Sequence, residues 1–223
     1  MADQYRQVVD QSITGLRTIT KGRVITPDDA EYQAARTIFY GGINSQPGAI
    51  VRAVDAHDVA SVVSFAHDSG LELAIRSGGH SLAGHCLSDG GIVLDLKEMR
   101  GLQIDAENRT AWAETGLTSG EYTAAAGAYG LATGFGDTPT VGIGGLTLGG
   151  GVGYLVRKYG LTIDNLLAAE IVTADGRLLH TDASSHPDLF WAIRGGGGNF
   201  GVVTRLQFRL RPVDTVVGGL IIL

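Results

Sequence analysis

Apolar and polar positions change their period several times along this chain. Residues 49–54 form an apolar run typical of a buried strand. Between Asp55, a suitable N-cap, and Gly70, a suitable stop, apolar residues then recur at helical spacing, and a second strand pattern follows. This order predicts a βαβ unit whose strands, at 50–54 and 73–75, lie parallel in one sheet.

The remaining pattern predicts a meander and a second unit. Strands at 91–96, 101–105 and 110–116 are expected to extend the first sheet. The elements expected after them are a short helix at 120–130, a loop at 135–145, a helix with a glycine-rich front at 147–160, a hairpin at 167–182, a helix at 186–195 and a long strand at 202–210. Phe190 and Trp191 in the last helix are expected in the core.

These elements predict an α+β fold in one domain, residues 1–215. A mostly helical lead-in at 1–45 precedes lobe one at 46–110 and lobe two at 111–215, and each lobe is expected to hold a mixed β-sheet with flanking helices. The apolar run 216–223 is interpreted as the start of a truncated substrate domain. A C-terminal strand docked on this same domain is the alternative.

Charge and composition exclude several classes of protein. The chain has 17 basic and 23 acidic residues, a net charge of −6, and its basic residues are scattered, so a nucleic-acid partner is not expected. Its apolar stretches are far shorter than the roughly 20 residues that span a bilayer, and no secretory signal is visible, so no membrane association is expected. One cysteine, Cys86, suits a reducing compartment, and the predicted location is cytoplasmic.

Glycine is the unusual component, with 34 of 223 residues and no three-residue period. The glycines gather in clusters at 78–79, 142–145, 149–153 and 195–201. Consecutive glycines leave backbone N–H groups unshielded, and such loops can wrap phosphate oxygens. The clusters therefore favour a phosphate-bearing ligand, while a plain turn remains the alternative for any single cluster.

Common phosphate and hydrolase motifs do not explain these loops. No P-loop is present, and the G-x-G-x-x-G at Gly196, Gly198 and Gly201 follows a helix and precedes a strand, the reverse of a Rossmann site. The histidine after Gly79, His80, projects from a loop that can approach a ligand closely. A metal site of His80, His85, Cys86 and Asp89 matches no common zinc spacing, so no metal is expected.

Several motifs in order carry a resemblance to a known family. They are RSGGHSLAG, GGIVLDLKEMRG, TPTVGIGGLTLGGGVGYLVRKYGLTIDN, IVTADG and DLFWAIRGGGGNFGVVT. Together, from about Pro47 to Pro212, they resemble the PCMH-type FAD-binding domain of the vanillyl-alcohol oxidase superfamily, particularly the berberine-bridge-enzyme-like FAD-linked oxidases. The resemblance implies a two-lobed domain with FAD between the lobes.

The resemblance also implies which residues contact FAD. The loop 76–81 and the segment 142–153 would wrap the pyrophosphate, and 195–203 would line the adenine and ribose. The implied cofactor-binding residues are Arg76, Ser77, Gly78, Gly79, His80, Ser81, Thr138, Val141, Gly142, Gly145, Gly149, Gly150, Gly153, Asn199, Gly201 and Val203. For Asn199, a turn residue is the alternative interpretation.

By the same resemblance, the imidazole of His80 would be joined covalently to the flavin 8α-carbon, which requires an unprotonated ring nitrogen. Many relatives add a cysteinyl link where this chain has Thr138, so only the histidyl link is expected. The implied function is oxidation of a small-molecule CH–OH or CH–NH substrate by hydride transfer to FAD, with dioxygen as the acceptor. The catalytic base would lie in the missing C-terminal domain, and nothing in the sequence fixes the oligomeric state. A non-catalytic flavin-binding fragment and a dehydrogenase with another acceptor are the alternatives.

Overall fold

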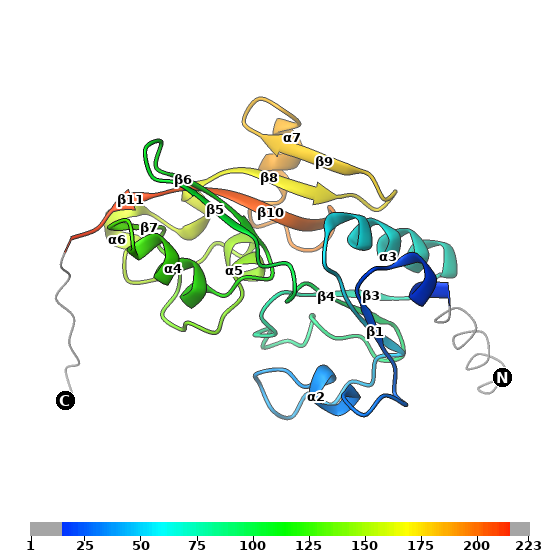
Figure 1. Ribbon diagram of the computed structural model, residues 1–223. Coiled ribbons are helices and arrows are strands. Elements are labelled where there is room, and N and C mark those ends of the chain that lie inside the picture. The colour runs from blue at the N-terminus through cyan, green and yellow to red at the C-terminus, as the bar shows by residue number, and fades with distance from the viewer. Residues whose placement is uncertain (1–14, 215–223) are drawn as a thin grey trace.

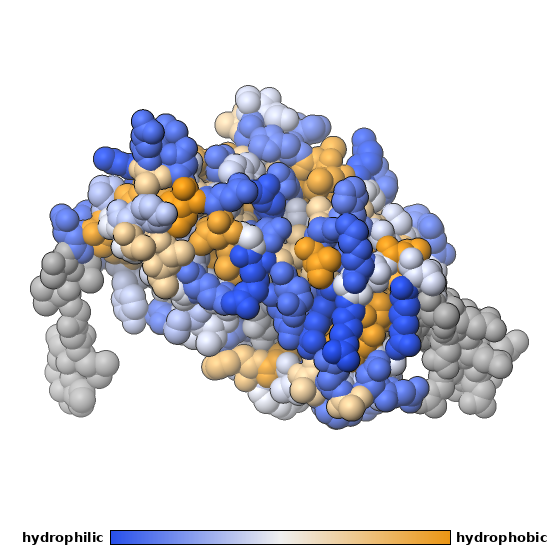
Figure 2. All heavy atoms as spheres, in the orientation of Figure 1, coloured by the Kyte–Doolittle hydropathy of each residue, from blue (hydrophilic) through white to orange (hydrophobic). Residues whose placement is uncertain are grey.

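The computed structural model describes residues 15–214 and shows two β-sheets lying next to each other, with helices against both (Figure 1). The α+β class and the two-lobed arrangement are therefore as predicted. In the surface view, hydrophilic side chains are interrupted by small apolar groups (Figure 2). Within the described residues, no helix is long and apolar enough to cross a membrane.

The first sheet contains the predicted βαβ unit. It has the order β1 (Arg23–Ile25), β2 (Ala49–Arg52), β4 (Ile92–Asp95), β3 (Leu73–Arg76). The strands β2 and β3 both run parallel to β4, which lies between them, and β1 pairs antiparallel at the edge. The connecting helix α3 (Ala56–Ser69) begins at Asp55, whose side chain accepts two backbone N–H bonds, and ends at Gly70 in the left-handed region.

The second sheet is antiparallel and has the order β5 (Leu102–Asp105), β6 (Thr110–Glu114), β10 (Val202–Arg209), β8 (Leu166–Val172), β9 (Leu178–Asp182). The prediction that the meander strands at 101–105 and 110–116 extend the first sheet is wrong. The strand β5 pairs with β6, and β6 pairs in turn with β10, about ninety residues further along the chain; alternation alone does not reveal such a long-range partner. The chain passes from the first sheet to the second between Asp95 and Leu102, which is earlier than the lobe boundary predicted at position 110.

Several short helices pack beside the second sheet (Figure 1). They are α4 (Ser119–Gly127), α5 (Ile143–Leu148), α6 (Val156–Tyr159), a 3₁₀ turn (Thr162–Asn165) and α7 (Pro187–Ala192). A two-stranded pair of β7 (Leu131–Ala132) and β11 (Arg211–Pro212) joins them. The helix predicted over 147–160 is replaced by α5, a loop and α6, because Gly150 and Gly151 have φ of +109° and +75°, outside the helical region.

Two further expectations are corrected. The lead-in is not mostly helical where it is described, since it contains β1, the helical residues 15–19 and the short helix α2 (Tyr32–Arg36). Phe190 is buried, but Trp191 is 74% exposed on the outer side of α7. The apolar run 216–223 lies outside the described residues.

The core explains how the two sheets are held together. One face of the first sheet packs on α3, and the other packs on α2, where Tyr32 and Ala35 are buried. The cluster under α3 continues to Val172 and Val202 at the ends of β8 and β10. Burying these side chains together fixes the position of one lobe against the other, and therefore fixes the seam between them.

Candidate functional site: a glycine-lined seam between the two sheets

The loop after β3 brings the first predicted cluster to the seam. Arg76 ends the strand, and the chain then passes through Ser77, Gly78 and Gly79 to His80. Gly79 has a φ of +70°, a conformation that a side chain would strain. The loop can turn this sharply because both glycines lack a Cβ, and the turn places His80 at the side of the second lobe.

Two glycine loops from different lobes touch at this point. A Cβ on Gly78 would lie 2.7 Å from the Cα of Gly142, and a Cβ on Gly142 would collide with the backbone nitrogen of Gly78. The hydroxyl of Ser77 donates to the carbonyl of Thr115, which follows β6. The structure therefore brings together residues 77–78 and 142, about sixty-five positions apart in the sequence, without intervening side chains.

The N-terminal end of α4 holds the second loop in place. The backbone N–H of Ser119 donates to Val141 O at 2.8 Å, and its hydroxyl donates to Thr138 O at 2.9 Å. The backbone N–H of Ile143 donates to Leu117 O at 3.0 Å. These bonds fix Thr138 and Val141, two of the predicted site residues, beside the loop that carries His80.

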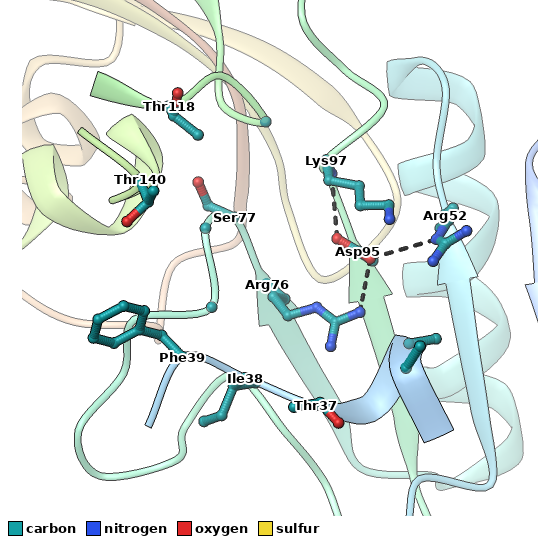
Figure 3. A pocket seen from close by; sticks show the side chains of 15 residues that line it. Thr37, Ile38, Phe39, Arg52, Arg76, Ser77, Asp95, Lys97, Thr118 and Thr140 are labelled. Carbon is teal, nitrogen blue, oxygen red and sulfur yellow. Dashed lines mark hydrogen bonds and ion pairs between the residues drawn. The ribbon is translucent and has the colours of Figure 1, made fainter. Parts of the chain in front are cut away.

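A cavity of about 270 Å³ opens next to these loops (Figure 3). Its lining residues come from the segment before β2, from the strands and loops of lobe one, and from the start of lobe two: Ala34, Ala35, Thr37, Ile38, Phe39, Arg52, Arg76, Ser77, Gly78, Gly79, Asp95, Lys97, Gly116, Thr118 and Thr140.

A buried charge cluster lies on one side of this cavity. In Figure 3 the side chains of Arg52 and Arg76 converge on Asp95. The Arg76 guanidinium donates to the Asp95 carboxylate at 2.7 Å, and Arg52 Nε lies 3.8 Å from it. The Arg76 side chain is 7% exposed, yet its Nη1 has no hydrogen-bond partner among the described residues. A buried donor nitrogen that lacks a partner is costly, so the cluster suits an anionic ligand.

His80 lies at the opposite side of the seam and contacts both lobes. Its Nε2 is 3.1 Å from the hydroxyl of Thr140, and its ring stacks on Phe39 with centroids 4.2 Å apart and planes at 21°. Tyr40 approaches edge-on at 6.3 Å. Burial lowers the pKa of His80 below its ordinary 6.5, which favours the neutral imidazole at physiological pH.

These features suit a phosphate-bearing ligand. Two bare backbone loops meet there, a buried guanidinium nitrogen lacks a partner, and the single carboxylate at the cavity, Asp95, is already paired with arginine. The exposed ammonium of Lys97 adds positive charge at the rim. Backbone N–H groups and cations are the groups that bind phosphates in proteins.

The other predicted site residues lie around this seam but do not line the cavity. Gly145 is in α5, and Gly149, Gly150 and Gly153 form the loop after it. A Cβ on Gly153 would collide with Phe135 O, so this glycine is explained by close packing.

The 195–203 segment reaches the seam only through its end. The carbonyl of Val203 accepts from the Thr115 hydroxyl at 2.8 Å, and Gly201 has no room for a Cβ beside Val172 O. Asn199 is exposed, and its amide donates to Gly196 O at 3.4 Å, as a turn residue would. Ser81 accepts from the backbone N–H of His85.

Sequence reasoning missed several cavity residues, namely Phe39, Arg52, Asp95, Lys97, Thr118 and Thr140. The sequence did contain a signal for one pair of these residues. Arg76 and Asp95 each follow an apolar run, and the parallel strands place them opposite each other in register. No comparable signal exists for Phe39, which reaches His80 through the fold of the lead-in.

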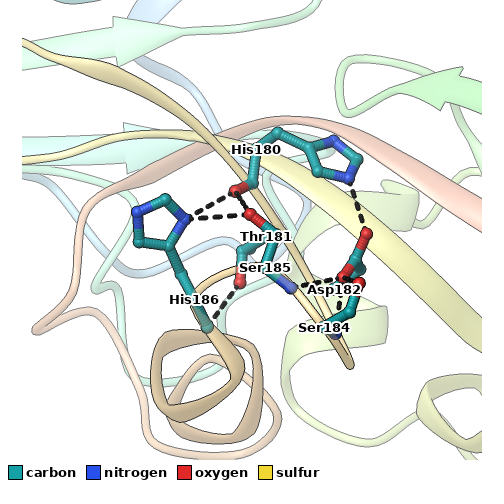
Figure 4. A network of polar contacts seen from close by, with 6 residues as sticks. All are labelled: His180, Thr181, Asp182, Ser184, Ser185 and His186. Carbon is teal, nitrogen blue, oxygen red and sulfur yellow. Dashed lines mark hydrogen bonds and ion pairs between the residues drawn. The ribbon is translucent and has the colours of Figure 1, made fainter.

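The alternative chemistries find no support in the described residues. No group of three His, Cys, Asp or Glu side chains there could hold a metal ion. The thiol of Cys86 is buried in the core of lobe one. His180 and His186 belong to a surface network around Asp182, where His180 Nε2 lies 2.9 Å from the carboxylate (Figure 4). This network organises the turn from β9 to α7.

Comparisons with known proteins show which family this chain resembles. The family described as FAD binding domain matches residues 47–182. (R)-6-hydroxynicotine oxidase of Paenarthrobacter nicotinovorans is 45% identical over 190 residues, 85% of this chain and 42% of the relative. Berberine bridge enzyme-like 27 of Arabidopsis thaliana is 42% identical over 178 residues, 77% of this chain and 33% of the relative.

A solved structure has the same architecture as this chain. Glucooligosaccharide oxidase from Acremonium strictum superimposes with a TM-score of 0.83 at 32% identity, covering 89% of this chain and 42% of the oxidase. The flavin of that oxidase is described as 6-S-cysteinyl, 8α-N1-histidyl FAD. The chain spans less than half the length of each of these proteins.

Proposed function

This chain belongs to the FAD binding domain family, among the PCMH-type FAD oxidases that include the berberine bridge enzyme-like proteins, and from this premise we propose that it holds one FAD across the seam between its two sheets. The observation that carries the proposal is the contact of the bare loops at Gly78 and Gly142 beside the unpaired Arg76 nitrogen.

Each lobe contributes a different group to the cofactor. The loop 76–81 supplies backbone N–H groups for the pyrophosphate, and the guanidinium of Arg76 supplies positive charge. The second lobe supplies the segment 138–142, which α4 fixes in place. Gly201 and Val203 would face the adenine and ribose end of FAD. This assignment is supported by Thr115, whose hydroxyl donates to Val203 O and whose carbonyl accepts from the Ser77 hydroxyl of the first loop.

The flavin would be attached covalently through His80 alone. Its ring is held between the two lobes, and burial keeps it neutral, as a nucleophilic nitrogen requires. A cysteinyl link is not proposed, because Thr138 stands where many relatives carry cysteine and Cys86 is buried away in the lobe-one core.

Bound FAD would supply a two-electron acceptor for hydride from a small-molecule CH–OH or CH–NH substrate, with dioxygen as the final acceptor. The chain's own part is to bind and orient the cofactor. No residue of this chain is proposed as the catalytic base, and the chain spans less than half of the named relatives.

Titration of the apoprotein with FAD tests the proposal. Gly142→Ala has no backbone penalty, since φ is −69°, but its methyl group would collide with the Gly78 loop. We expect one FAD per chain in the wild type and at least a roughly tenfold weaker affinity in Gly142→Ala, equivalent to about 1.4 kcal/mol. Gly127→Ala, a glycine with no atom within 4 Å of an added methyl, is the matched control and should bind like the wild type. Equal affinity in all three proteins would refute the seam as the site.

The acceptor can be tested on the loaded protein. Flavin reduced chemically under anaerobic conditions should reoxidise promptly when air is admitted. Reduced flavin that persists in air would favour a dehydrogenase with another acceptor. A full-length protein that shows no turnover with any alcohol or amine donor would favour a non-catalytic flavin-binding role.

A further inference from the structure

The bond between His80 and Thr140 is a polar side-chain contact across the seam. His80 belongs to the loop after β3, and Thr140 belongs to the segment that α4 fixes in lobe two. Their 3.1 Å contact uses one nitrogen of the imidazole, Nε2. Among the described residues, Nδ1 makes no side-chain hydrogen bond, and the Thr140 backbone is a second partner of the ring.

The surroundings of the ring restrict its motion. Phe39 covers one face at a centroid distance of 4.2 Å, and Tyr40 meets the ring edge-on. Stacking on Phe39 fixes the plane of the imidazole ring. The hydrogen bond to Thr140 then determines which of the two ring nitrogens faces the threonine. The other nitrogen is left with its lone pair available when the proton is on Nε2.

We propose that the Thr140 hydroxyl is a positioning residue for flavin attachment: it accepts the Nε2–H of His80, so that Nδ1 is the nitrogen that bonds the flavin 8α-carbon. The inference rests on the proposed FAD function and adds the residue that selects the bonding nitrogen. The glucooligosaccharide oxidase is described with an N1-histidyl linkage, and N1 corresponds to Nδ1.

The step balances with dioxygen as oxidant. A bond forms between Nδ1 and the 8α-carbon, while one C–H bond of the flavin methyl group and the Nε2–H bond of His80 break. The two electrons pass through the flavin ring to dioxygen, which takes up two protons and leaves as hydrogen peroxide. Thr140 is exposed, so the proton from Nε2 has a path to solvent.

A hydroxyl suits this role because it can exchange its donor and acceptor functions. Before the bond forms, Thr140 accepts from Nε2–H; afterwards Nε2 carries a lone pair, and the same hydroxyl donates to it. A carboxylate at this position would instead favour the protonated imidazolium, which has no lone pair to form the bond.

The test measures attachment apart from binding. Apoprotein of the full chain, expressed under riboflavin depletion, is mixed with FAD in air. Reversible binding is followed by flavin fluorescence, and attachment by flavin that stays with acid-precipitated protein. At saturating FAD, so that any change in affinity is removed, we expect Thr140→Val to attach the cofactor roughly ten- to a hundredfold more slowly than the wild type, the range for loss of a hydrogen bond that orients a functional imidazole. Thr140→Ser should restore the rate, and the exposed Thr123→Val on α4 is the matched control.

The linkage isomer separates positioning from a general structural role. Fragmentation and NMR of the isolated histidyl-flavin should show only the Nδ1 linkage in the wild type and a share of Nε2 linkage in Thr140→Val. Unchanged rate and linkage in Thr140→Val, or an Nε2 link in the wild type, would overturn the inference. Wild-type protein that binds FAD without attaching it would overturn the inference and leave the FAD-binding function standing. Absence of any FAD binding would overturn both.

Discussion

At the scale of single residues, the site is a balance of buried charges. Asp95 is 1% exposed and is contacted by Arg76 and Arg52. The sequence pattern placed Arg76 at a strand end but did not reveal Asp95 as its partner. The two belong to strands that are adjacent in the sheet, and their register became visible only once β4 was found next to β3.

Breaking this pair should be strongly destabilising. Asp95→Asn leaves the Arg76 cation buried without a counter-charge, and we expect a loss of roughly 3–5 kcal/mol of unfolding free energy in urea. Arg177→Met removes an exposed ion pair with Asp175 and serves as the control, with a loss below about 1 kcal/mol. Similar, small losses in both variants would show that the buried pair does not matter for stability.

The lowered pKa of His80 predicts how stability depends on pH. Because burial lowers the folded-state pKa below 6.5, the unfolded chain binds a proton that the folded chain does not. The free energy of unfolding of the wild type should therefore fall relative to that of His80→Gln as the pH is lowered. The loss should begin near about pH 7.5, pass through the unfolded-state pKa of 6.5 and end at the lowered folded-state pKa. Above that window the difference should be constant.

Urea unfolding of the two apoproteins between pH 5 and 8 measures this. A wild type that gains stability over His80→Gln on acidification would mean that the folded state favours the imidazolium, against the proposed nucleophile.

At the scale of elements, local patterns predicted most strands and helices, but not which sheet each strand joined. α3, the hairpin of β8 and β9, α7 and β10 lie where the sequence pattern predicts them. The alternating pattern predicts β5 and β6 in the first sheet, yet they pair with each other and β6 pairs with β10, which places both in the second sheet. The glycines of 149–153 were assigned to a helix, although positive φ at Gly150 and Gly151 prevents one.

The N-terminus of α4 supports the second loop through a capping box. The Thr118 hydroxyl accepts from the backbone N–H of Glu121 at 3.3 Å, and the Glu121 carboxylate accepts from the backbone N–H of Thr118 at 2.9 Å. Thr118→Ala should cost about 1 kcal/mol of unfolding free energy. Thr118→Ser should retain most of it.

Thermal or urea unfolding of the three proteins checks the cap. An alanine variant as stable as the wild type would show that the segment 138–142 is held by its other bonds alone.

At the scale of the whole molecule, the function depends on two sheets that share one core under α3 and face each other across the seam. Glycine clusters indicated a phosphate ligand, and the motif order indicated the family. The cavity lining came from segments as distant as 34–39 and 140, and only the folded chain brings these segments together.

Trypsin separates the two candidate attachment sites onto different peptides. Cleavage after Arg76 and Lys97 yields 77–97, which contains His80, His85 and Cys86, and cleavage after Arg109 and Arg157 yields 110–157, which contains Thr138. Mass spectrometry of the FAD-loaded, denatured chain therefore shows where the flavin is attached. We predict one flavin on 77–97, assigned to His80 by fragmentation and absent from His80→Ala. Flavin on 110–157, flavin on His85 or Cys86, or a chain that carries none would rule out attachment through His80.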